Sequence, residues 1–248
     1  MAALAAFIFV NVRSVRARAH RREAAAVARD TTIVGAGLVQ GSVRRALIPA
    51  GERQATAAPE MRRRVQGLAP GTYIGDILAE QDSALYRWPE RLSNALRVYI
   101  EPTSAIAGFD VRYPEMARTV FGEWSQAGFP LTFTFIYDSA SADITIRWVD
   151  RFAPDEGQRI GVTERVQTST FQIAKAHVAI ANHDSIGRAL AVMAVGGIIR
   201  HEIGHALGLN HANDPTSVMY RESATSTIGA SDRATLRLLY LVPPGSLK

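Results

Sequence analysis

Four stretches in the middle of the chain are rich in threonine, isoleucine and aromatic residues or alternate apolar with polar positions, as half-buried strands do. They are "LTFTFI", "DITIRWV", "RIGVTERV" and "AHVAIA". A helix near residues 114–126 separates them from an earlier strand in "SNALRVYIEP". So long a crossover is consistent with parallel pairing. The pattern predicts an α/β protein with a mixed sheet that carries helices.

Apolar residues recur at helical spacing in the run that begins at Ile186, "IGRALAVMAVGGIIRHEIGHALG". The spacing predicts a helix with His201 and His205 on its inward, apolar stripe. Asp184 or Ser185 is the predicted N-cap. Two consecutive glycines inside the run cost about 1 kcal/mol each relative to alanine. They indicate either close packing against a neighbour or a local irregularity.

Three of the six histidines of the chain lie in one short stretch, "RHEIGHALGLNH". Histidines four residues apart project from one face of a helix, so His201 and His205 can point at one ion. A third ligand six residues later requires the chain to turn. Gly208 supplies the break, because glycine can take the left-handed conformation that commonly ends helices. With His211, three imidazoles leave a fourth tetrahedral position for water, which is typical of catalytic zinc.

Glu202 lies about 100° around the helix from His201, so its carboxylate flanks the ion rather than joining the ligands. A carboxylate there can act as general base toward water whose pKa zinc lowers to about 7. HExxH alone also arises by chance in exposed helices, but HExxHxxGxxH is far more specific. The residues therefore predict metal-assisted hydrolysis with one catalytic Zn²⁺.

The stretch "HEIGHALGLNH" followed by "SVMY" resembles the metzincin metallopeptidases, whose signature is HExxHxxGxxH plus a later methionine-containing turn. Met219 matches that methionine, and the resemblance implies that it forms an apolar floor beneath the metal without being a ligand. An ordinary buried methionine is the alternative. The order of elements upstream and the closing helix in "IGASDRATLRLLYLVPPG" resemble the matrixin branch over roughly residues 86–248.

The resemblance implies a metzincin-like catalytic domain of α/β (α+β) class, with a mixed twisted sheet, a zinc-binding active-site helix and a C-terminal helix. In that family an edge strand lies beside the cleft, and we expect it at about Ile160–Val166. A peptide that added a strand there would be held by main-chain hydrogen bonds. This favours a protein or peptide substrate.

Two departures from the matrixin pattern limit the resemblance. The chain has no cysteine, so latency through a cysteine bound to zinc cannot operate. His177 and His183 lie in the region of the additional metal ligands of matrixins but lack the accompanying pattern. We expect them to be surface or strand residues, and Ca²⁺ or a second zinc has no supporting ligand pattern.

Charge is distributed unevenly along the 248 residues, whose formal net charge is +5. Residues 1–64 carry a net charge of +8 and residues 65–248 a net charge of −3. Nucleic-acid-binding domains concentrate positive charge on the recognition face. Because the part that holds the histidines is slightly acidic, we expect no nucleic-acid partner.

The N-terminus joins an apolar run, "AALAAFIFV", to the basic "NVRSVRARAHRR". Nine apolar residues are too few to span a bilayer, and a secretory signal carries its positive charges before the run. We expect an apolar and basic leader at 1–30, a linker or weakly ordered extension at 31–85 and the peptidase domain at 86–248. A clipped leader is another interpretation, and residues 1–64 could dock on anionic membrane.

Two functions of different class are consistent with these residues. The first is a zinc-dependent endopeptidase in which metal-activated water hydrolyses the peptide bond with Glu202 as general base. The second is a non-catalytic, metal-dependent peptide-binding module of the same fold. Glu202 argues against the second, because a binding module needs no base beside its ion. Since members of the family mostly work outside the cytoplasm, we expect an extracytoplasmic or secreted monomer, with a membrane tether as an alternative.

Overall fold

The computed structural model describes residues 42–48, 58–90, 94–153, 158–222 and 225–248. A six-stranded sheet of order β1-β6-β7-β5-β3-β4 forms its centre. Its strands are β1 (Ser42–Ile48), β3 (Leu96–Ile100), β4 (Phe133–Ile136), β5 (Ile144–Val149), β6 (Gly161–Thr168) and β7 (Ile173–Ala181). Every neighbouring pair is parallel except β6 with β7. The predicted α/β class with a mixed sheet is confirmed.

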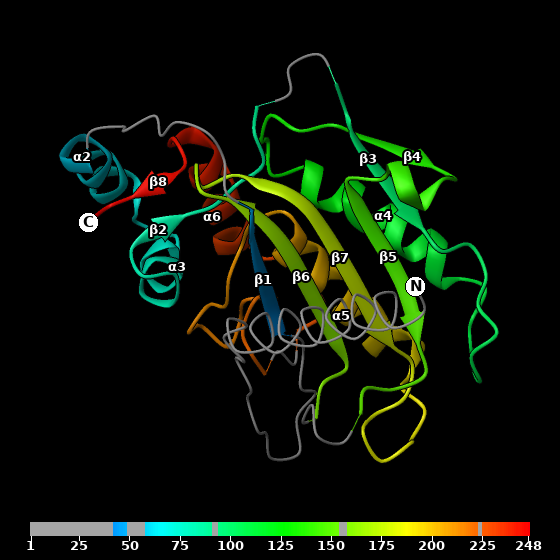
Figure 1. The fold of residues 1–248 in the computed structure, drawn as a ribbon. Helices are drawn as coiled ribbons and strands as arrows, with labels where there is room; N and C mark the ends of the chain where they lie inside the picture. The colour runs from blue at the N-terminus through cyan, green and yellow to red at the C-terminus, as the bar shows by residue number, and fades with distance from the viewer. Residues whose placement is uncertain (1–41, 49–57, 91–93, 154–157, 223–224) are drawn as a thin grey trace, which may run out of the picture.

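Two long helices, α4 (Tyr113–Ser125) and α5 (Val192–Ala206), pack behind this sheet in the view of Figure 1. Helix α5 is buried from Val195 to Ile199, which fits its contacts with β6, β7 and α4. The indole Nε1 of Trp124 on α4 donates a hydrogen bond of 3.1 Å to the carbonyl of Arg200. The two helices therefore cross close to the HExxH segment.

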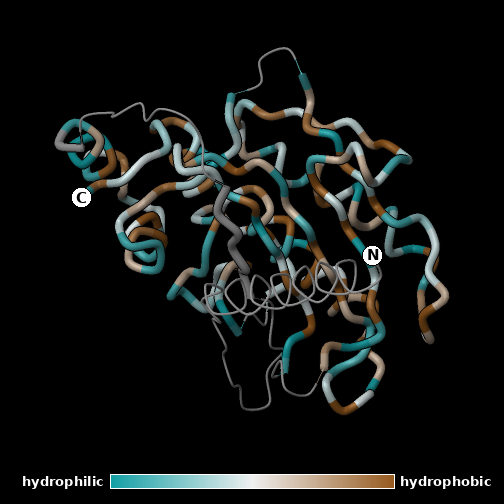
Figure 2. The backbone as a smooth tube through the Cα atoms, in the orientation of Figure 1, coloured by the Kyte–Doolittle hydropathy of each residue, from teal (hydrophilic) through white to brown (hydrophobic). Residues whose placement is uncertain are grey.

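The glycine pair in α5 is explained in part by this crossing. A Cβ added at Gly196 would lie 2.8 Å from Cε of Met116 on α4, so a side chain there would displace the end of the Met116 side chain. Of the two interpretations, this contact favours close packing against a neighbour at Gly196. Figure 2 shows hydrophobic segments interspersed with hydrophilic ones along the strands, as expected for a sheet with one covered face.

Helix α5 begins at Val192, with Ala191 as its N-cap residue, and not at the predicted Asp184 or Ser185. The Asp184 carboxylate instead accepts hydrogen bonds from the backbone N–H groups of Ile186 and Arg188. These contacts close a separate turn, as aspartate commonly does. The predicted helix start is therefore wrong, because the cap residue serves a turn that precedes the helix.

Residues 58–85 differ from the expected linker or weakly ordered extension. They form α2 (Ala58–Leu68), α3 (Ile74–Glu80) and β2 (Ala84–Leu85), and β2 pairs with β8 (Gly245–Ser246) after the closing helix α6 (Ala230–Leu241). Met61, Ile74 and Ile77 are buried in the main hydrophobic core. These elements are short and find their apolar partners far along the chain, so local periodicity does not reveal them. The expected leader at 1–30 lies outside the described residues.

The expected edge strand is also not an edge. Strand β6 covers the predicted position, but β1 pairs with it in parallel along its whole length, from Ser42 opposite Val162 to Ile48 opposite Thr168. The expectation is wrong because β1 comes from a distant segment with no strand-like alternation. In the described sheet the outermost strands are β1 and β4.

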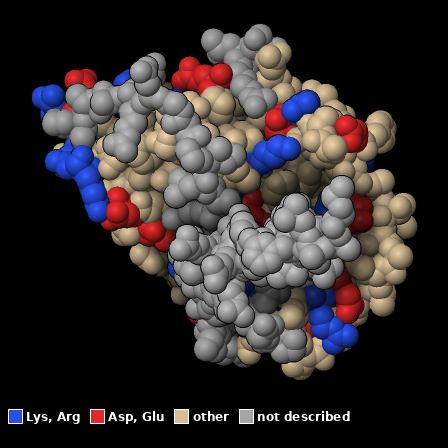
Figure 3. Space-filling model, viewed as in Figure 1, with Lys and Arg blue, Asp and Glu red and all other residues tan. Residues whose placement is uncertain are grey.

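The described surface seen in Figure 3 carries acidic and basic side chains close to one another rather than a field of one sign. In the portion of the chain with described coordinates, we find no helix with both the length and the apolar character needed to cross a bilayer.

Candidate metal centre

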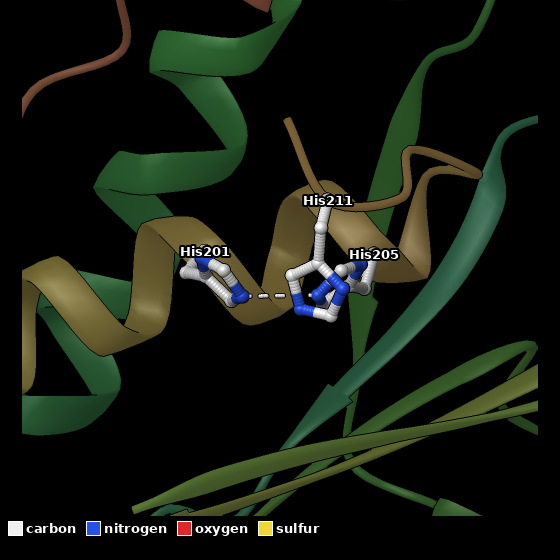
Figure 4. Close-up of side chains that lie close together, drawn as sticks. All are labelled: His201, His205 and His211. Carbon is white, nitrogen blue, oxygen red and sulfur yellow. Dashed lines mark hydrogen bonds between the residues drawn. The ribbon is translucent and has the colours of Figure 1, made fainter. Parts of the chain in front are cut away.

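The three predicted ligands converge. Helix α5 carries His201 and His205 on one face, and the chain leaves the helix through Gly208, whose φ of +112° lies in the left-handed region. The turn returns His211 to the other two rings, as Figure 4 shows. One nitrogen from each ring lies within 4.8 Å of the others. The turn at Gly208 is tight, because an added Cβ would approach the carbonyl oxygen of Tyr86 to 2.9 Å.

Backbone carbonyls determine the protonation of two of these rings. Nδ1 of His201 lies 2.7 Å from the carbonyl oxygen of Val218, and Nδ1 of His205 lies 2.9 Å from that of Leu209. A carbonyl only accepts, so each Nδ1 carries the hydrogen and each Nε2 presents a lone pair. Complete burial lowers the pKa of His201 to about 3 and that of His205 well below its usual value, so both rings are neutral.

The two Nε2 atoms of His201 and His205 lie 3.0 Å apart. Two lone pairs at that separation repel each other unless a positive charge lies beside both. Neutral imidazoles that converge with their Nδ1 atoms already bonded are the donor set that zinc takes in proteins. The residues present therefore fit a zinc ion.

His211 comes from the turn and not from the helix, and its surroundings differ. Its Nδ1 lies 3.1 Å from Oε1 of Glu80, and its backbone N–H donates a 3.2 Å hydrogen bond to Oε2 of the same carboxylate. Glu80 also lies 3.5 Å from a guanidinium nitrogen of Arg221. Glu80 is the last residue of α3, in the segment expected to be a linker, and no sequence signal identified it.

Glu202 is buried behind the histidines, against strand β6. The hydroxyl of Thr163 donates a 2.6 Å hydrogen bond to its Oε2. Its Oε1 has no hydrogen-bond partner among the described residues. Burial is the main cause that raises the pKa of Glu202 to about 8, and the Thr163 hydrogen bond opposes the shift. A cation at the histidines would favour the carboxylate and lower this pKa.

Strand β6 makes room for this carboxylate at Gly161. A Cβ built on Gly161 would overlap the Oε1, Cδ and Cγ atoms of Glu202. Strand β6 thus supplies a hydrogen bond at one position and empty space two residues earlier, on the same face of the strand. Sequence reasoning missed both residues, because it placed the strand without its register against α5.

A protein-family model described as matrixin, a peptidase family, matches residues 94–241, which is more than half of the chain. The chain belongs to the matrixin family. Over 51 residues it is 43% identical to a probable matrix metalloproteinase, 095L, of Invertebrate iridescent virus 3. That match covers 20% of this chain and only 14% of the viral protein. Family membership and the histidine triad together imply one catalytic zinc ion.

The methionine of this matrixin lies beneath the histidine helix. Met219 is fully buried, and its Sδ lies where a Cβ on Gly204, between His201 and His205, would have to be. The turn before it is held by the buried Asp232 of α6, which accepts hydrogen bonds from the hydroxyl of Ser217 and the backbone N–H of Val218. The carbonyl of Val218 contacts Nδ1 of His201, so Asp232 is linked to the His201 ring through the backbone of Val218.

A cavity of about 420 Å³ adjoins the third histidine. Its lining residues come from α3 and from the turn after the triad: Asp76, Ala79, Glu80, His211, Ala212, Asn213, Tyr220, Arg221 and Glu222. The cavity therefore lies between the third histidine of this matrixin and α3, a helix that sequence patterns did not predict.

His177 and His183 lie apart from the metal centre. Nδ1 of His177, on β7, is 2.8 Å from the hydroxyl of Thr145, and Nδ1 of His183 is 2.8 Å from a carboxylate oxygen of Asp150. Within the described ranges, the triad is the one group of three or more such side chains with metal-ligand spacing.

Proposed function

We propose that this matrixin is a zinc-dependent endopeptidase, with His201, His205 and His211 as metal ligands and Glu202 as general base. The arrangement of Glu202 supports the assignment most directly. One oxygen of its carboxylate is held by Thr163, and the other has no partner among the described residues. A carboxylate arranged in this way can accept a proton without first breaking a hydrogen bond.

Each residue has a distinct part in the reaction. The ligand histidines present their Nε2 atoms, because the Nδ1 atoms of His201 and His205 are bonded to carbonyls. A bound zinc ion would lower the pKa of water and polarise the substrate carbonyl. Oε1 of Glu202 takes the proton from the attacking water and passes it to the amine nitrogen as the peptide bond breaks.

The alternative is a metal-dependent module that binds peptides without cleaving them. Such a module gains nothing from a buried carboxylate beside its ion, and burying one is unfavourable. Here strand β6 leaves space at Gly161 and donates from Thr163 to accommodate that carboxylate. These two features favour the hydrolase.

We further propose a protein or peptide substrate that pairs with β6, and a place of action outside the cytoplasm. A substrate that pairs with β6 is held by main-chain hydrogen bonds, which do not depend on the identity of its side chains. Because β1 occupies this side of β6 in the structure, a substrate that pairs with β6 must displace β1. A monomer, and membrane docking through residues 1–64, remain expectations; most of that segment lies outside the described residues.

Measurement of zinc content and casein cleavage tests the proposal. Glu202→Gln should keep zinc and lose cleavage by about 10²- to 10⁴-fold, the usual contribution of a general base. His201→Ala should lose both zinc and cleavage. If the wild-type protein binds zinc but cleaves casein and a peptide library no faster than Glu202→Gln does, the binding module replaces the hydrolase.

A further inference from the structure

We propose that Glu80 is a positioning residue for His211, and that helix α3 fixes the position of this third metal ligand. This inference rests on the ligand assignment above. It extends the metal centre to a segment that precedes the residues matched by the matrixin model, 94–241.

The carboxylate of Glu80 contacts His211 twice. Oε2 accepts the backbone N–H at 3.2 Å, and Oε1 faces Nδ1 at 3.1 Å. A carboxylate only accepts when ionised, so the ring donates through Nδ1–H and its Nε2 is the nitrogen directed to the metal. One side chain thus fixes the position of the backbone, the tautomer and the orientation of the ring.

His211 depends on a positioning side chain more than His201 and His205 do. His201 and His205 project from a helix and are oriented by carbonyl oxygens at 2.7 and 2.9 Å. His211 follows the helix after the turn at Gly208, where no regular ladder holds the backbone. A hydrogen-bonded carboxylate also makes the ring a stronger ligand by stabilising its developing positive charge.

Two further side chains, Asp76 on α3 and Gln81 directly after it, also bond the turn that carries His211. The carboxylate of Asp76 accepts hydrogen bonds from the backbone N–H and the side-chain amide of Asn213, at 2.9 and 2.8 Å. Nε2 of Gln81 donates a 2.7 Å hydrogen bond to Oδ1 of Asn210. Contacts on both sides of His211 therefore join the turn to one short element, and the direct contact to the ligand is made by Glu80.

Zinc affinity is the decisive measurement, made by competition with a chromophoric chelator. Glu80→Ala should weaken zinc binding by about 10- to 100-fold, the usual effect of removing a partner that orients a ligand. Glu80→Gln keeps one acceptor oxygen and should fall between Glu80→Ala and wild type. Glu60→Ala is the matched control, because Glu60 is an exposed residue of the neighbouring helix α2. It should bind zinc as wild type does.

A spectroscopic measurement separates positioning from stability. The visible absorption of the Co²⁺-substituted protein reports the ligand geometry, so Glu80→Ala should change this spectrum and Glu60→Ala should not. If Glu80→Ala does not fold, Glu80→Gln and Glu80→Asp carry the same test. An unaltered zinc dissociation constant and Co²⁺ spectrum in these variants would overturn the proposal, even if thermal stability falls. A wild-type protein that binds no zinc would overturn the proposed function as well.

Discussion

The hydroxyl of Thr163 donates a hydrogen bond of 2.6 Å to Oε2 of Glu202 and lies 3.0 Å from the carbonyl oxygen of the same residue. One threonine on β6 thus contacts both the backbone and the side chain of the proposed general base on α5. The contact orients the carboxylate and leaves Oε1 without a hydrogen-bond partner among the described residues, which is why we propose that Oε1 takes the proton.

Replacement of Thr163 by valine should lower casein cleavage by about 10-fold with little change in zinc content. A hydrogen bond to a charged group contributes about 1.5–3 kcal/mol. Without it Glu202 is less well oriented, and we expect part of this free energy to be lost from the transition state. Thr163→Ser keeps the hydroxyl and should stay near wild type. In the Glu202→Gln background, Thr163→Val should have no further effect, because the two residues act as a unit. Equal losses in both backgrounds would refute the coupling.

Replacement of Gly161 by alanine should displace the carboxylate of Glu202 and reduce cleavage strongly, with zinc retained. The added Cβ would overlap a side-chain end, which can move, so the fold should tolerate the change while the base loses its position. Gly67→Ala on α2 is the control, since nothing lies within 4 Å of its added Cβ. We expect the control to keep full activity and to gain about 0.5–1 kcal/mol in stability. Full activity in Gly161→Ala would contradict the proposed place of the base.

Removal of residues 1–57 should speed the cleavage of peptides, because it takes away β1 and exposes the edge of β6 while α2 remains complete. An Arg45→Pro variant of the full chain should act in the same direction, since proline interrupts strand pairing. Activity per zinc-loaded protein is the quantity to compare, with thermal unfolding as the check on folding. If both variants fold, bind zinc and cleave at the wild-type rate, β1 does not compete with substrate.

Most of the strands and two helices could be predicted because their signals are local. Alternation identified β4 to β7, and a helix near 114–126 corresponds to α4. The histidine positions followed from helix geometry, since residues four apart share a face whatever surrounds the helix. A local signal misled at the start of α5, because one residue type serves two structures. Asp184 closes a turn, and the helix that it was predicted to cap begins at Val192.

What the sequence determined by itself is the candidate site: three histidines as proposed metal ligands and one glutamate as the proposed base, all within eleven residues, with a glycine where the chain must turn. What only the tertiary structure decided is which distant groups hold that set in place. Glu80 is 131 residues from His211 and Thr163 is 39 residues from Glu202. Their contacts depend on how α3 packs against the turn after α5 and on how β6 packs against α5 itself, and a one-residue shift in a strand turns each side chain to the opposite face. No local pattern carries that information, because strand register is a property of the assembled sheet.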